Sequence, residues 1–164
     1  MLDDKSKSTI LSKYASYIKE NNLRSTPERD VILAQVLELH DLFELEDLRV
    51  RMVEISYYVS NATLYNSLNL FCRCGILYKH QFDDATSRYQ RMPMRNGVQY
   101  LICRECRKVK MVKDPEFMSF VNTKRYNAFT IDQFNVYVYG LCNNCLRRLK
   151  KEALLKKEVQ NSRK

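Results

Sequence analysis

Apolar residues recur every three or four positions in three separate stretches near the start of the chain, the spacing typical of one buried helix face. The three stripes predict helices at about residues 10–20, 27–40 and 45–53. Thr26 and Pro27 suit the N-cap and the first position of the second helix. Residues 40–43, which separate the second stripe from the third, are predicted to form a loop.

A fourth helical segment, starting at Asn61, has two faces of different chemistry. Ser60 suits its N-cap, and Gly75 supplies the left-handed residue that ends it. One face is apolar, and the other carries short, almost uncharged side chains: Asn61, Ala62, Tyr65, Asn66 and Asn69. Such a face can enter a major groove, because asparagine pairs bidentately with adenine. The alternative is an ordinary solvated helix face.

Residues 76–82 and 87–92 read as two strands that flank a polar turn at 83–86. Helices followed by such a hairpin predict a winged helix. Basic side chains around it are candidates for phosphate contacts, while the acidic ones cluster between residues 44 and 54. These basic candidates are Arg24, Arg29, Lys79, Arg88 and Arg91.

A second domain follows a break in the pattern at residues 93–97, which we predict to be a hinge. Strands are predicted at 98–103, 109–112 and 134–139, a helix starting at Asp114–Pro115, and a final helix from Leu146 to about Gln160. The whole is an α+β chain: winged helix 1–92, hinge 93–97, dimerisation and zinc-binding domain 98–146, basic helix or tail 147–164. Alternating residues in the third strand suit a sheet that a second copy covers.

Two Cys-X-X-Cys pairs lie in the second domain: Cys103 with Cys106, and Cys142 with Cys145. Four thiolates on two such knuckles can enclose one zinc ion per chain, with no coordination position left open. A site of that kind is structural. The alternatives are a redox-active dithiol or two disulfides.

The net charge of +9 is unevenly distributed. Residues 1–92 contain 12 Lys/Arg and 13 Asp/Glu, whereas residues 93–164 contain 16 and 6. The basic tail is a solvated face or a nucleic-acid contact. An acidic start without an apolar run argues against a signal peptide, and no stretch has membrane-spanning length, so we expect a cytoplasmic protein with no membrane partner.

The order of these parts resembles the ferric uptake regulator (Fur) family of bacterial transcription factors, over roughly residues 20–146. The resemblance rests on residues 24–29, 46–48, 62–68 with 75–76, 101–103 with Cys106, and 137–142 with Cys145. It implies a homodimer whose winged helices bind a double-stranded DNA operator and whose C-terminal domains pair. By position, Arg24 and Tyr65 would contact DNA, and Asn66 stands where the family often has arginine.

The resemblance fails at the regulatory metal site, where the family usually has histidines and carboxylates. Residues 95–100 contain neither, Gln90 replaces a carboxylate, and Phe134 replaces a common histidine. The only histidines, His40 and His80, are expected to be surface or capping residues. We therefore expect the structural zinc to remain and the regulatory site to be lost.

Cys72 and Cys74 are the remaining thiols, and Arg73 between them could lower a thiol pKa. They are a redox switch or simply small buried residues. The sequence favours a DNA-binding regulator, most simply a repressor. The alternative is a zinc-stabilised protein- or RNA-interaction module that uses the basic half. An enzyme is disfavoured, because the zinc site is closed and no phosphate loop or triad pattern is present.

Overall fold

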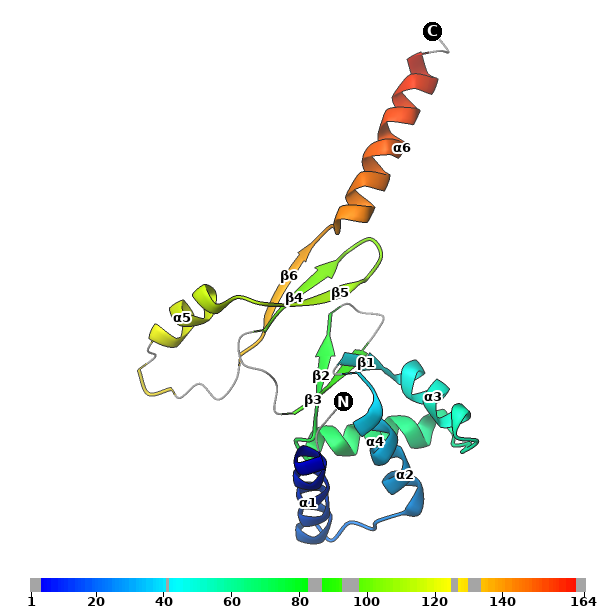
Figure 1. The fold of residues 1–164 in the computed structure, drawn as a ribbon, viewed down its shortest axis with the longest axis vertical. Helices are drawn as coiled ribbons and strands as arrows, with labels where there is room; N and C mark the ends of the chain where they lie inside the picture. The colour runs from blue at the N-terminus through cyan, green and yellow to red at the C-terminus, as the bar shows by residue number, and fades with distance from the viewer. Residues whose placement is uncertain are drawn as a thin grey trace. The chain divides into compact units, whose positions relative to one another are not determined.

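The computed structural model describes residues 4–40, 42–82, 87–92, 98–124, 127–129 and 134–161. The chain forms two compact units, Met1–Met94 and Arg95–Lys164. Helices and a three-stranded sheet occur in each unit (Figure 1), so the predicted α+β class is confirmed. The predicted turn at 83–86 and hinge at 93–97 lie outside the described residues.

The helices of the first unit begin where the sequence places capping residues. They are α1 (Asp4–Glu20), α2 (Pro27–Glu38), α3 (Leu45–Glu54) and α4 (Asn61–Arg73). The Thr26 hydroxyl accepts a hydrogen bond from the Arg29 amide at 3.4 Å, and the Ser60 hydroxyl accepts one from the Thr63 amide at 3.1 Å. Gly75 has φ +64° just after α4, as predicted for a left-handed helix end.

The sheet of the first unit has the order β1-β3-β2 and is antiparallel. Its strands are β1 (Leu42–Glu44), β2 (Leu77–Gln81) and β3 (Ser87–Arg91). β2 and β3 are the predicted hairpin. The predicted loop at 40–43 is wrong for residues 42 and 43, because β1 pairs with β3 and places Phe43 opposite Tyr89, with ring centroids 5.8 Å apart. The three residues of β1 are too few to show the alternation of apolar and polar positions that is typical of a strand. They form a strand because the edge of β3 provides their hydrogen-bond partners.

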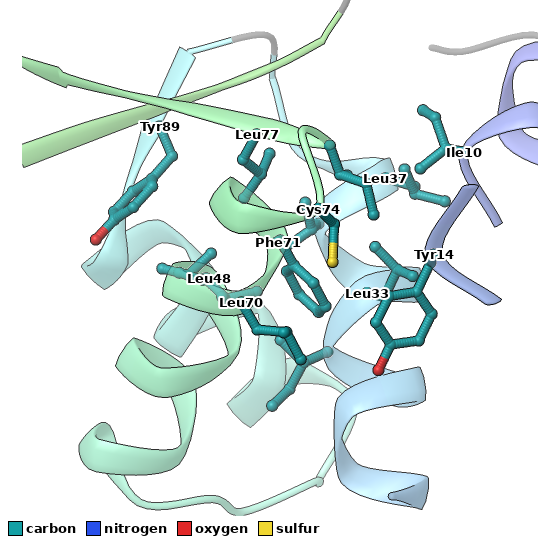
Figure 2. Packing of buried hydrophobic residues seen from close by; sticks show 14 of the residues in the cluster. Ile10, Tyr14, Leu33, Leu37, Leu48, Leu70, Phe71, Cys74, Leu77 and Tyr89 are labelled. Carbon is teal, nitrogen blue, oxygen red and sulfur yellow. The ribbon is translucent and has the colours of Figure 1, made fainter. Parts of the chain in front are cut away.

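The core of the first unit holds α4 against α1, α2 and α3 (Figure 2). Leu64, Leu68 and Phe71 of α4 have no exposed surface. The ring of Tyr14 from α1 meets Phe71 edge-on, with centroids 5.7 Å apart. Each fully buried side chain of this size stabilises the fold by about 1.5–3 kcal/mol. The apolar face of α4 is thereby fixed inward.

Arg91 joins the end of β3 to the end of α2. Its Nη1 donates hydrogen bonds to the carbonyl oxygens of Val36, at 3.1 Å, and Leu37, at 3.3 Å, and also to that of Leu39. The residue is only 8% exposed. The prediction that Arg91 contacts phosphate is therefore wrong, because its guanidinium satisfies carbonyls at a helix end.

The second unit has a sheet in the order β5-β4-β6. Its elements are β4 (Val98–Cys103), β5 (Val109–Lys113), α5 (Pro115–Thr123), β6 (Val136–Gly140) and α6 (Asn143–Asn161). β4 is antiparallel to β5 and parallel to β6. Asp114 caps α5 as predicted, accepting from the Phe117 amide at 2.9 Å. No helix in the described part of the chain has the apolar run needed to traverse a bilayer.

Candidate metal centre and nucleic-acid interface

The four cysteines of the two Cys-X-X-Cys pairs converge at one end of the second sheet. The parallel pairing of β4 with β6 sets Cys103 opposite Gly140, so both knuckles start from the same end. All four sulfur atoms lie within 4.8 Å of one another, and those of Cys106 and Cys142 are 3.8 Å apart. A tetrahedral zinc with Zn–S bonds of about 2.3 Å has sulfur atoms about 3.8 Å apart. The cluster therefore has the dimensions of a zinc site.

Backbone amides favour the thiolate form of two of the four cysteines, Cys103 and Cys142, whereas hydrogen bonding to Cys142 raises the pKa of Cys145. The amide of Cys142 donates to the sulfur of Cys103 at 3.3 Å. Amide donation from Cys106 and Cys142 lowers the pKa of Cys103 to about 6, and the amide of Cys145 lowers the pKa of Cys142. Thiolates are the form that binds zinc. All six cysteines of the chain are free thiols, so the disulfide alternative does not describe this structure.

The polar face of α4 points away from the core. Asn61, Tyr65 and Asn66 are exposed, and Asn69 is half-buried. The Nζ atom of Lys79, on β2, lies 5.6 Å from the centroid of the Tyr65 ring, within cation–π range. The charged Lys79 side chain therefore lies beside the nearly uncharged polar face of α4. In such an arrangement the lysine can contact a phosphate while the helix face contacts bases.

Two of the arginines predicted to contact DNA, Arg24 and Arg88, differ in their surroundings. Arg24 is exposed, between α1 and α2. Arg88 is engaged within its own unit, because its Nε lies 2.7 Å from Oε1 of Glu44 and its guanidinium carbon lies 5.9 Å from the Phe82 ring centroid. A phosphate contact by Arg88 requires this ion pair to open or to be shared.

Comparison with known proteins identifies the family. The family model described as "Ferric uptake regulator family" matches residues 20–139, which is most of the chain. The chain belongs to the ferric uptake regulator family. Membership supports a DNA-binding, metal-binding transcriptional regulator.

Three members of the Fur family are 20% to 26% identical to this chain. The peroxide-responsive repressor PerR of Staphylococcus saprophyticus is 25% identical over 129 residues, which cover 78% of this chain and 86% of that protein. The Helicobacter pylori ferric uptake regulator is 20% identical with a TM-score of 0.71, covering 85% of this chain and 93% of the other. A zinc-bound manganese uptake regulator is 26% identical with a TM-score of 0.56, covering 79% and 98%.

His80 of this Fur-family protein is not at the surface, and the prediction of a surface or capping role for it is wrong. It has no exposed area, and its Nε2 lies 2.8 Å from Oε1 of Gln90. Its ring stacks on Phe82 with centroids 5.1 Å apart. Burial lowers the pKa of His80, partly offset by the hydrogen bond to Gln90, so the imidazole is neutral at pH 7. The pattern of apolar and polar residues along β2 did not by itself indicate that this histidine faces inward.

The candidate redox pair at the end of α4 has unreactive surroundings. Burial raises the pKa of Cys72 to about 11 and also raises that of Cys74. Arg73 lowers the pKa of Cys74, as anticipated, but the effect of burial is larger. Both residues contribute to the hydrophobic core. These surroundings favour a packing role over a sensing role.

Proposed function

We propose that this Fur-family protein is a cytoplasmic, homodimeric transcriptional repressor that reads a duplex operator with α4. One zinc ion per chain, held by the four clustered cysteines, stabilises its second unit. The observation that carries the proposal is the exposed polar face of α4, with Lys79 beside Tyr65, on a helix whose other face is fully buried.

The chemistry of this face suits base recognition. Asn61 and Asn66 offer an amide donor and acceptor that match the major-groove edge of adenine, and Tyr65 offers a hydroxyl and a ring. The residues proposed to contact DNA are Arg24, Asn61, Tyr65, Asn66, Asn69 and Arg88. Because α4 is anchored by its apolar face, these side chains are presented from a rigid support.

Pairing of two chains is supported by apolar side chains left exposed on the second unit. They include Met111, Phe120, Val138, Tyr139 and Leu141. A hollow of about 460 Å³ lies on the same unit, lined in part by Leu101, Val138 and Leu141. Exposed apolar side chains of this kind can mark protein–protein contacts, and we propose a second copy of this unit as the partner.

The metal proposal has two parts. The four-sulfur cluster fits zinc in number, spacing and charge, and leaves no open position for chemistry. The usual regulatory site is proposed to be absent, since Gln90 is a neutral amide hydrogen-bonded to His80 where the family often has a carboxylate. The names of the relatives point to peroxide, iron and manganese, and the proposal therefore includes no particular inducing signal. The repressor direction follows the name of the peroxide-responsive relative.

Selection from a pool of random duplexes by the zinc-loaded protein tests the proposal. The expected result is enrichment of one sequence made of two related half-sites, as a dimer of winged helices would select. The same selection with Tyr65→Ala should enrich that sequence weakly. If wild-type protein recovers no preferred duplex, the alternative of a protein- or RNA-interaction module is favoured instead.

A further inference from the structure

The last helix lies outside the part of the chain that the family model matches. That match ends at residue 139, whereas α6 runs from Asn143 to Asn161. Its 19 residues contain six Lys/Arg and two Glu, a balance of +4. Figure 1 shows α6 continuing from the end of β6 as a single straight helix. Part of the basic excess of the second unit therefore lies on this helix.

The charges of α6 are arranged on different sides of the helix. Arg148 binds two acidic neighbours, Glu105 at 2.6 Å and Glu152 at 3.4 Å. Arg147, Lys150 and Lys151 lie at i, i+3 and i+4, the spacing of neighbours on one side of a helix. All three are exposed, and no ion pair joins them to an acidic group within the described ranges. Among the side chains that the structure describes, Arg148 thus pairs with the nearby acids, and no acid pairs with the three residues of this basic face.

We propose that Arg147, Lys150 and Lys151 form a second DNA-binding surface that contacts phosphate groups of the duplex independently of base sequence. This inference rests on the proposed function of the protein as a duplex binder. Duplex DNA carries one negative charge per about 1.7 Å of its axis, so an uncompensated basic face gains affinity by releasing condensed counterions. Contacts of this kind position a protein on DNA without reading bases.

A lipid surface or a partner helix fits α6 less well. A helix that binds either one gathers its apolar residues on one face. Steps of about 100° per residue place Leu154 about 80° and Leu155 about 180° round the axis from Leu146, so the leucines are dispersed. The stripe that starts with Leu146 and Leu149 is also interrupted by Lys156. Charge, rather than apolar area, is the feature that this helix offers.

The test compares full-length, zinc-loaded wild type with the triple variant Arg147→Gln/Lys150→Gln/Lys151→Gln. Glutamine keeps a similar helix propensity, so circular dichroism and zinc content should be unchanged. Affinity for a random-sequence duplex is measured against salt concentration. The slope of log affinity against log salt should fall by about 0.9 for each phosphate that the variant no longer neutralises, up to about 2.7 per chain. Preference for the selected sequence over the random duplex should persist.

Lys156→Gln, on another side of the same helix, is the matched control and should leave the slope unchanged. An unaltered slope in the triple variant contradicts the inference. The inference is also contradicted if the triple variant keeps its duplex affinity and loses binding only to single-stranded RNA or only to phosphatidylserine vesicles. If wild-type protein selects no preferred duplex but the triple variant still lowers the salt slope, the proposed regulatory function fails while this phosphate contact stands.

Discussion

The Nε2 atom of His80, on β2, lies 2.8 Å from the Oε1 atom of Gln90, on β3. Both residues are almost completely inaccessible, so each satisfies a polar group that water cannot reach. The pair carries no charge while the imidazole is neutral. It therefore fills an interior position at little electrostatic cost.

Acid should destabilise the first unit through His80. Burial lowers the pKa of His80 in the folded chain below the ordinary value of 6.5, so the unfolded chain binds a proton at a higher pH than the folded chain does. The contribution of neutral His80 to stability is complete above its ordinary pKa of 6.5. It is lost as the pH falls through the lower pKa that His80 has in the folded chain. Urea unfolding at pH 7 and pH 5 should show a smaller pH dependence for His80→Gln than for wild type. His40→Gln, which removes the exposed histidine, should match wild type, and the reverse pattern would reject the assignment.

Substitutions on the two opposite faces of α4 should affect different properties: one the stability of the fold, the other the affinity for DNA. Leu68 has no exposed surface, so Leu68→Ala should lower the free energy of unfolding by about 2–5 kcal/mol. Tyr65 is 45% exposed, so Tyr65→Ala should leave stability nearly unchanged and weaken binding to the selected duplex by about 1–3 kcal/mol. Unfolding curves and fluorescence anisotropy provide the two readouts. Equal duplex affinity for wild type and Tyr65→Ala would exclude Tyr65 from the interface.

Cys72 and Cys74 should react slowly with electrophiles in the folded protein. A pKa of about 11 leaves on the order of one Cys72 thiol in three thousand ionised at pH 7.5, and the thiolate is the reactive form. Mass mapping after iodoacetamide treatment should show at least about tenfold slower labelling of both residues in buffer than in urea. Rapid labelling in buffer, together with loss of duplex binding after peroxide, would support a redox switch.

The parts of the fold that depend on local chemistry are predicted well from sequence. Thr26, Ser60 and Asp114 each accept a backbone hydrogen bond at the helix start that their residue types indicate. The Cys-X-X-Cys spacing likewise identifies four residues whose sulfur atoms do converge. These features need only neighbouring residues, or one strong motif, to specify them.

The parts that depend on distant partners are predicted poorly. β1 exists because the edge of β3 is available, and nothing within residues 42–44 indicates it. Arg91 looks like a free surface cation in sequence, yet it binds carbonyls more than 50 residues away. His80 is buried beside Gln90, 10 residues later, on the facing strand. In each case tertiary contacts, rather than local preference, decide the role of the residue.

Zinc content is the most direct test of the claim that a four-cysteine site stabilises the second unit. After exhaustive dialysis, elemental analysis should find about one zinc per chain, with no second ion retained when iron or manganese is added. Cys106→Ser should lose the zinc and unfold the second unit, while the circular dichroism of the helices in the first unit persists. A zinc-free chain that stays folded and still binds the selected duplex would contradict the account.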